Sequence, residues 1–488
     1  MTADQTAFAR SSGSFSRRSF LGRSSAAIAG VAGAAGVLRP ALAQSTGQPA
    51  PSDRVIIGLI GCGRRGLQLL EAAAKVPGLT VSLVCDVDAE RSAAAAERVM
   101  QLQGRRPGVT SDYRDLLDDA DINGVIIATP DHWHATQLLH ACAAGKDVYL
   151  EPPVSLTPLE AKAMVFVARK YSRVVQVGLQ QRAARKFAEG AGIVRSGNLG
   201  RIAQTRTWTF ARSEPITAQP DAAPPPSLDY DRWLGPAPER PFNPVRYAHP
   251  EHCWDYGGGE AACWGVHFQD LLHAAMNVSV PRSVVAFGGN QGLADGRETP
   301  DTLEALFEYA SPTGTFMHAY SLRLSNAYAG FGPAALPPLT GHTGPLPARS
   351  GVQILGTEKT LYFSGRRLLL LPAGEESPIE DLAYLGIGSR EVAAGESAAG
   401  PDPLTVAHVQ EFAACIRSRK DPSASIEAGQ SASFPLMAAN IAYRVGRKLY
   451  INPNSFEFYS DPELQTPDKT ANELAIRAYR ASYPPPNV

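Results

Sequence analysis

The chain has 488 residues, of which 44% are hydrophobic and 19% are charged, so it can bury a large core and is long enough for two domains. Its formal net charge of −1 gives no reason to expect a nucleic acid or an anionic membrane surface as a partner. The six cysteines do not indicate a disulfide framework. A single bridge between Cys253 and Cys263 could form outside the cytoplasm.

Residues 1–43 have the features of an export signal, followed by a linker over 44–52. Ser16 to Leu21 reads S-R-R-S-F-L, a twin-arginine pattern. The weakly apolar stretch 26–38 is shorter than the about 20 residues that a membrane span needs, and Ala41-Leu42-Ala43 is a small-residue cleavage site. We therefore expect an exported, periplasmic protein without a membrane span. Removing the signal takes away five arginines and one aspartate, which leaves a formal charge near −5.

The segment from Arg54 to Gly66 begins the folded part of the chain. Val55 to Ile60 is an apolar run, typical of a strand buried on both faces, and it ends in G-C-G-R-R-G, a G-x-G-x-x-G. A helical pattern follows, and then Thr80 to Cys85 reads as a second strand with Asp86 directly after it. Strand, glycine turn, helix, strand and acid in this order predict a dinucleotide site.

Each residue of this pattern has a physical role. Gly61 allows the tight turn, Gly63 lets the backbone approach a pyrophosphate, and Gly66 lets the helix pack on the sheet. A carboxylate at Asp86 accepts hydrogen bonds from a ribose diol and repels a 2′-phosphate, which favours NAD over NADP.

Alternating strands and helices continue to Val174–Gly178, so residues 53–178 are predicted to form a Rossmann domain with a doubly wound parallel sheet. Ligands of such sheets lie beyond the carboxyl ends of the strands. The residues that we predict to bind the cofactor are Gly61, Gly63, Arg64, Arg65, Gly66, Asp86, Thr129, Pro130, His134, Glu151 and Gln180.

The pattern changes near residue 180. Alternation of polar and apolar residues over 202–210, 283–287, 301–309, 315–321 and 351–355 predicts a mostly antiparallel sheet, and helical spacing recurs over 406–416 and 437–449. Residues 179–455 are thus expected to form a second, α+β domain with a large open sheet. Residues 326–350 are predicted to form a long surface loop, which is a candidate lid. Residues 456–488 are predicted to form a tail that wraps the surface or a neighbouring subunit.

The chain resembles the Gfo/Idh/MocA family, the glucose–fructose oxidoreductase and inositol dehydrogenase group, in its exported branch. The resemblance covers about residues 53 to 455, and its segments include G-L-I-G-C-G-R-R-G, A-T-P-D-H-W-H-A, Y-L-E-P-P-V-S, W-D-Y-G-G-G-E and W-G-V-H-F-Q-D. It implies bound NAD(P), a sugar or polyol as substrate, and a C-terminal sheet that serves as a homo-oligomer interface.

Two positions depart from the family pattern. Family dehydrogenases carry E-K-P after the fifth strand, with a Lys that handles the hydroxyl proton, whereas this chain has Pro152 there. The Asp or Asn that family members place four residues before a His is Cys263 here, so only His267 remains. His267 is either the catalytic base or a structural histidine that hydrogen-bonds the sugar. Asp270 is a second catalytic candidate, or simply a satisfied polar group on the same helix.

Four further residues are predicted to bind substrate. Arg182 is one, and the others are the W-D-Y segment Trp254-Asp255-Tyr256, read either as an aromatic sugar platform or as a packed loop. No metal site is predicted, because nothing near the H-x-H of His132 and His134 completes one.

The sequence therefore predicts an oxidoreductase that keeps NAD tightly bound and acts on a sugar or polyol by hydride transfer at a secondary alcohol. An exported enzyme has no nicotinamide pool to recycle its cofactor, so a closed redox cycle is expected. One alternative is a redox-neutral NAD-dependent glycosidase or lyase, since those relatives also lack the Lys. The other is a non-catalytic protein that binds a sugar or nucleotide.

Overall fold

The computed structural model describes residues 54–312, 314–327, 350–364, 367–373, 380–381 and 401–486. The described residues all belong to one compact unit, Pro49–Val488. The predicted export signal and linker, and residues 328–349 of the predicted lid, lie outside the described residues.

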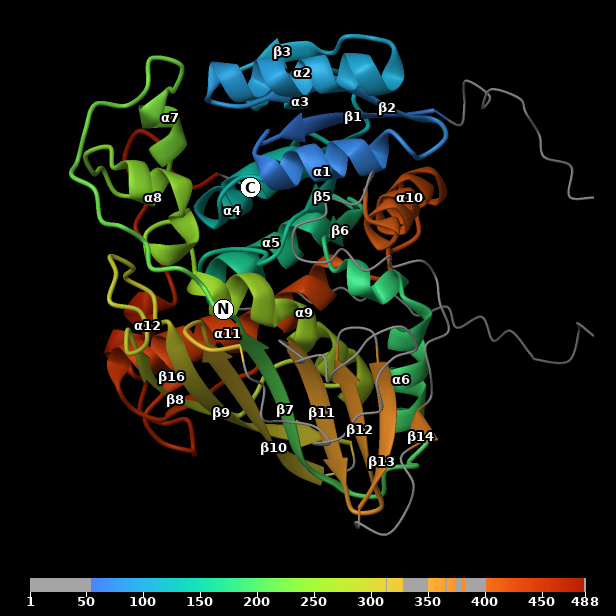
Figure 1. The fold of residues 1–488 in the computed structure, drawn as a ribbon, viewed down its shortest axis with the longest axis vertical. Helices are drawn as coiled ribbons and strands as arrows, with labels where there is room; N and C mark the ends of the chain where they lie inside the picture. The colour runs from blue at the N-terminus through green and yellow to red at the C-terminus, as the bar shows by residue number, and fades with distance from the viewer. Residues whose placement is uncertain are drawn as a thin grey trace, which may run out of the picture. The chain divides into compact units, whose positions relative to one another are not determined.

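The first domain is a six-stranded parallel sheet in the order β3-β2-β1-β4-β5-β6, with helices between the strands (Figure 1). Strand order reverses between β1 and β4, as in a doubly wound fold. Its elements are β1 (Val55–Ile60), α1 (Arg64–Ala73), β2 (Leu79–Cys85), α2 (Ala89–Gln103), β3 (Gly108–Thr110), α3 (Arg114–Asp118), β4 (Gly124–Ile127), α4 (Asp131–Ala143), β5 (Asp147–Leu150), α5 (Pro158–Lys170) and β6 (Val175–Val177).

The central strands are the most apolar runs of the chain because helices cover both faces of the sheet. All four residues of β4 and of β5 are buried. This buried core fixes the positions of the loops that follow each strand, and those loops carry the site.

The second domain is built on a ten-stranded sheet in the order β14-β13-β12-β11-β7-β10-β9-β8-β15-β16. Neighbouring strands are antiparallel except β7 and β10, which pair in parallel. The strands are β7 (Ile202–Phe210), β8 (Ser283–Gly289), β9 (Thr302–Ser311), β10 (Gly314–Arg323), β11 (Ser350–Gly356), β12 (Lys359–Ser364), β13 (Arg367–Pro372), β14 (Glu380–Asp381), β15 (Leu449–Ile451) and β16 (Phe458–Tyr459).

Helices α9 (Gly259–Met276) and α11 (Ile426–Val445) lie between this sheet and the Rossmann domain (Figure 1). α9 is therefore buried along much of its length, and its N-terminal half reaches the Rossmann loops. The remaining elements are η2 (Gln180–Ala183), α6 (Arg185–Arg195), α7 (Tyr230–Leu234), α8 (Pro244–Ala248), η3 (Pro250–His252), α10 (Pro403–Ser418) and α12 (Lys469–Leu474).

Two C-terminal segments return to the Rossmann domain. Helix α10 packs Val409 and Phe412 into the core around β1 and α1. The sequence pattern places this helix in the second domain, and the structure corrects that prediction. The predicted tail packs on its own chain, where Arg477 Nε donates to Glu160 of α5 at 2.6 Å and Tyr483 meets Trp133 of α4. Among the described residues, no helix combines the length and the apolar character that crossing a bilayer requires.

Candidate functional site

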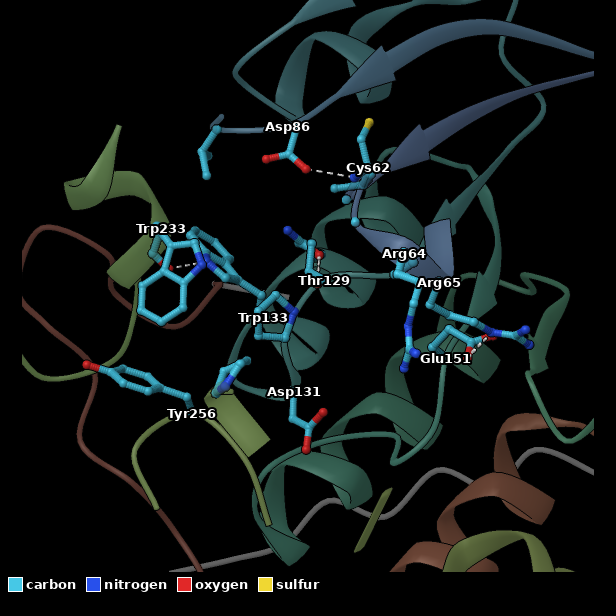
Figure 2. Close-up of a pocket in the computed structure, with 18 of the residues that line it drawn as sticks. Cys62, Arg64, Arg65, Asp86, Thr129, Asp131, Trp133, Glu151, Trp233 and Tyr256 are labelled. Atoms are coloured by element: carbon cyan, nitrogen blue, oxygen red, sulfur yellow. Dashed lines mark hydrogen bonds and ion pairs between the residues drawn. The ribbon is translucent and has the colours of Figure 1, made fainter. Parts of the chain in front are cut away.

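The two domains meet at a cavity of about 1090 Å³, at the carboxyl ends of β1, β2, β4 and β5. Ligands of open parallel sheets bind at this edge, next to the switch in strand order. The volume slightly exceeds the range of about 300–1,000 Å³ found for small-molecule sites. Figure 2 shows the Rossmann loops on one side of the cavity and the aromatic side chains of Trp233 and Tyr256 on another.

The glycine turn after β1 leaves room for an anion at the start of α1. Gly61 has a φ of +92°, and a Cβ there would meet the backbone of Ala128 at 2.7 Å. A Cβ on Gly66 would fall on the carbonyl oxygen of Gly61, so Gly66 lets α1 pack against the turn. Gly63 differs, because a Cβ there would meet nothing within 4 Å. No side chain caps α1, so its first N–H groups are available to a phosphate.

Asp86 lies at the end of β2 and is fixed by the backbone (Figure 2). Its Oδ2 accepts a hydrogen bond from Cys62 N at 2.7 Å, and its Oδ1 accepts one from Asp88 N at 2.9 Å. Each oxygen keeps a lone pair for a ligand hydroxyl. Burial raises the pKa of Asp86. Arg91 borders the same part of the cavity, where it stacks over Tyr247 at 4.7 Å.

Thr129, Pro130, Glu151 and Gln180 line the middle of the cavity, where β4, β5 and β6 end. Arg65 Nε donates to Glu151 Oε2 at 2.8 Å, which joins α1 to the loop after β5 (Figure 2). Arg65 Nη2, Glu151 Oε1 and Gln180 Oε1 are buried without a hydrogen-bond partner in the described part of the chain. Buried polar atoms of native proteins are normally paired, so three orphans on one cavity indicate a polar ligand.

His134 does not line the cavity, contrary to the prediction that it binds the cofactor. Its Nδ1 lies 2.8 Å from the carbonyl oxygen of Pro153, and its Nε2 lies 2.8 Å from that of Thr129. The ring therefore holds the loops after β4 and β5 against each other. The peptide bond between Pro152 and Pro153 in the second loop is cis.

One face of α9 borders the cavity through Glu260, Cys263, Trp264 and His267. The spacing of three and four residues puts these side chains on one stripe of the helix. His267 Nδ1 is buried and finds no hydrogen-bond partner among the described residues. Burial, with a contribution from the charge on Arg65, lowers the pKa of His267 to about 4, so the imidazole is neutral at pH 7. Burial also keeps the Cys263 thiol protonated by raising its pKa.

Two carboxyl groups that the sequence analysis did not select lie at this end of the cavity. Burial and the charge on Glu251 raise the pKa of Asp131 to about 8 and that of Glu260 to about 7. Asp131 accepts a backbone hydrogen bond from Gly258, while its Oδ2 has no partner in the described structure. A sequence signal existed for Asp131, because it lies at the start of α4, beyond the carboxyl end of β4, where a parallel sheet presents its functional groups.

Asp270 and Arg182 do not reach the cavity, which corrects their predicted roles as catalytic and substrate-binding residues. Arg182 donates hydrogen bonds to both carboxylate oxygens of Asp270, at 2.6 to 3.0 Å, and another to the carbonyl oxygen of Ser423. The Asp270 side chain is only 1% exposed. Three residues beyond His267 the helix has advanced about 4.5 Å, away from the cofactor edge and into the core.

The W-D-Y segment does not act as one platform. Tyr256 borders the main cavity, with its ring 4.9 Å from that of Trp233. Trp254 and Asp255 face a separate cavity of about 230 Å³ on the other side of the segment. There Asp255 pairs with Arg240 at 2.6 Å, so neither residue is placed to bind substrate in the main cavity.

Neither Cys253 nor Cys263 forms a disulfide. His132, half of the H-x-H, is buried with Nε2 3.0 Å from the carbonyl oxygen of Trp233. A different set of possible metal ligands, His249, Glu251 and His252, lies close together at the cavity wall. No metal site is predicted here from the sequence, although the H-x-E-H spacing of this segment is visible in it.

Known proteins with similar sequences match about a third of this chain. The uncharacterized oxidoreductase YrbE of Bacillus subtilis is 30% identical over 184 residues, covering 38% of this chain and 49% of that protein. A glycosyl hydrolase family 109 protein of Saccharopolyspora erythraea is 35% identical over 173 residues, or 33% of this chain and 38% of that protein. The chain thus spans about half or less of the length of these relatives.

Solved structures match over most of the described chain. Levoglucosan dehydrogenase in complex with NADH superposes with a TM-score of 0.58 at 19% identity, over 81% of this chain and 98% of that one. An NAD-binding oxidoreductase from Klebsiella pneumoniae gives a TM-score of 0.58 at 20% identity, over 82% and 100%. At these identities the likeness concerns the fold.

Two family models match successive parts of the chain. Residues 55–179 match the oxidoreductase family with an NAD-binding Rossmann fold. Residues 199–281 match the C-terminal α/β domain of the same oxidoreductase family. Both models describe the domains in the order in which the structure has them. Residues 55–179 and 199–281 thus belong to the Gfo/Idh/MocA oxidoreductase family, the first segment being its NAD-binding Rossmann domain.

Proposed function

We propose that the protein holds NAD through its reaction cycle and moves a hydride at a secondary alcohol of a sugar or polyol. The observation that carries this proposal is His267, a neutral imidazole with an unpartnered nitrogen on the cavity shared with Glu151 and Gln180. The carbohydrate class rests on the names of similar proteins, a levoglucosan dehydrogenase and glycosyl hydrolases.

The residues present fit the cofactor. The open space beside Gly63 and the uncapped start of α1 suit a pyrophosphate, and Asp86 offers lone pairs to a ribose diol, which favours NAD over NADP. Bound NAD would supply the acceptor for the hydride of the alcohol carbon. His267 takes the hydroxyl proton on Nδ1, the task that Pro152 cannot perform in place of the family Lys.

A redox-neutral glycosidase is the second candidate, and the cavity acids favour it. With pKa values of about 8 and about 7, Asp131 is mostly protonated and Glu260 about half protonated at pH 7, so both can donate a proton to a leaving group. Glycosidases use a carboxyl group with a raised pKa in this way. Relatives named as glycosyl hydrolases of family 109 support the same reading.

The test begins with protein purified without added cofactor and then denatured to release any nucleotide. Stoichiometric NAD(H) supports a closed cycle, and the protein is then incubated with sugars and glycosides in D₂O. Deuterium that enters the sugar next to the oxidised carbon supports hydride cycling, and free aglycone indicates the glycosidase. A protein that is empty and binds no added NAD would contradict both enzymatic functions and leave a non-catalytic binding protein.

Gly63→Ala tests the cofactor site separately from the fold. Because a Cβ at this position meets no protein atom within 4 Å, we expect the thermal melting temperature of the protein without cofactor to change little. The methyl group would stand in the space proposed for the pyrophosphate, and overpacking of about 1–3 kcal/mol corresponds to about 5- to 150-fold weaker NAD binding. Titration calorimetry with NAD measures this. Unchanged affinity would contradict the placement of the pyrophosphate.

We also propose that residues 1–43 direct export by the twin-arginine route and that the mature protein is periplasmic. The twin arginines Arg17 and Arg18 and the small-residue site at 41–43 support this. Fractionation of cells that express the wild type and Arg17→Lys/Arg18→Lys tests it. The wild type should reach the periplasm, and equal distribution of the two would contradict the proposal.

The outer face of the ten-stranded sheet supports homo-oligomer formation. Phe287, Leu306 and Met317 of neighbouring strands share this face and are 69%, 50% and 57% exposed. Adjacent apolar side chains on an open face are typical of an interface. Light scattering of the wild type and Phe287→Lys/Met317→Lys should give a multiple of the chain mass for the first only.

A further inference from the structure

The segment between α8 and α9 gathers three side chains with metal-ligating atoms. It reads His249-Pro250-Glu251-His252, and ligand atoms of the two histidines and the glutamate lie within 4.8 Å of one another. His249 Nδ1 lies 3.4 Å from Glu251 Oε1, and His252 Nε2 lies 3.6 Å from the same oxygen. Ligands bound to zinc at about 2.0–2.1 Å in a tetrahedral site stand about 3.4 Å apart, so these contacts already have the required spacing.

His252 is the most buried of the three side chains. Its side chain is only 8% exposed, and its Nδ1 is buried without a hydrogen-bond partner among the described residues. Buried imidazole nitrogens are normally paired in native proteins. The other ring nitrogen, Nε2, lies 3.6 Å from Glu251 Oε1, where it is placed to share an ion with the carboxylate.

The surrounding charge also favours a cation. Glu251 shares its end of the cavity with Asp131 and Glu260, and its charge acts on both of these carboxyl groups. No ion pair links any of them to a lysine or arginine in the described parts of the chain. A divalent ion at this point would offset the negative charge of Glu251.

We propose that His249, Glu251 and His252 bind one divalent transition-metal ion at the substrate end of the cavity. Two imidazoles and one carboxylate suit Zn²⁺, Co²⁺, Mn²⁺ or Fe²⁺, whereas Mg²⁺ and Ca²⁺ prefer oxygen ligands. His249 and Glu251 line the cavity, so the remaining coordination positions face it. If the proposed function holds, vicinal hydroxyl groups of a sugar are the oxygen ligands that the ion would take there.

The test uses the full chain, stripped with a chelator and titrated with Co²⁺ in the absence of sugar. We expect one ion per chain by calorimetry and a visible ligand-field absorption. Glu251→Gln and His252→Gln should each weaken Co²⁺ binding by more than tenfold, and Zn²⁺ should displace Co²⁺. The control variants are Glu239→Gln, on an exposed glutamate of the same domain, and His140→Gln, on α4.

Binding of equal strength in the wild type and Glu251→Gln, or no stoichiometric binding at all, would overturn the proposal. Thermal melting and NAD affinity, measured on every variant, identify a folding defect. Glu251 is 29% exposed on its side chain, so Glu251→Gln carries the test if His252→Gln fails to fold. Because no sugar is present, a failure here leaves the proposed hydride transfer standing, and the deuterium experiment can fail without affecting the metal result.

Discussion

Replacing His267 with glutamine should lower the rate of hydride transfer by about 10²- to 10⁴-fold, the usual contribution of a general base. The change keeps a hydrogen-bonding side chain of similar size on α9 but removes the imidazole, whose Nδ1 can accept a proton. NAD affinity should stay near the wild-type value, since the glycine turn and Asp86 lie elsewhere on the cavity. Single-turnover fluorescence of bound NADH with a substrate sugar measures the rate.

The pH dependence gives this prediction a second readout. The pKa of His267 is lowered to about 4 from an ordinary value near 6.5, so the neutral, proton-accepting form persists as the pH falls below 6.5. In the wild type, kcat/KM should therefore lose the contribution of this base only as the pH approaches about 4. His267→Gln should lack that limb.

A matched control is His140→Gln, which replaces a histidine on α4 that does not line the cavity. It should keep the wild-type rate. If His267→Gln retained more than half of the wild-type rate, His267 would be a structural residue, and Glu260 on the same stripe of α9 would become the candidate base.

The Rossmann domain could be predicted in detail because its signals are local. The apolar run of β1, the glycine turn and Asp86 lie within one stretch of chain, and the structure puts Asp86 against the turn through Cys62. The packing of α10 on β1 could not be predicted in the same way. A stripe of apolar residues shows that a helix is buried, but not which of two sheets it covers.

The second domain was predicted as a class but not in its topology. Strands β7 to β11 show clear alternation, whereas β12 and β13 were missed, since a run such as Leu368-Leu369-Leu370-Leu371 does not alternate. The parallel pairing of β7 and β10 depends on contacts far apart in sequence. No local pattern records such a pairing.

The residues of the candidate site also differ in how far the sequence could predict them, because some depend on contacts between distant segments. Asp270 lies three residues after His267 on α9, close to the same helical face. Because α9 runs into the core beyond His267, Asp270 is buried and does not line the cavity. Trp254 and Tyr256 are close in sequence, yet they border different cavities. The carboxyl groups of Asp131 and Glu260 come together only when α4 and α9 meet, which requires the tertiary fold.

Arg182→Ala should lower the free energy of unfolding by about 3–5 kcal/mol, because it leaves a buried carboxylate without its partner. Asp270 is 1% exposed on its side chain and receives both Nε and Nη2 of Arg182. Urea unfolding followed by tryptophan fluorescence measures the loss. The control is Arg185→Ala on α6, whose partner Glu189 lies on the surface, and it should cost less than about 1 kcal/mol.

The stability deficit of Arg182→Ala should also depend on pH. Burial raises the pKa of Asp270, and Arg182 opposes that rise, so removing the arginine raises the pKa further. When the pKa of a carboxyl group is higher in the folded than in the unfolded protein, the free energy of unfolding falls as the pH rises. The deficit should therefore be largest near neutral pH and shrink in acid. Arg182→Met/Asp270→Leu, which buries no charge, should recover most of the stability, and failure to do so would mean that the pair contributes more than its charges.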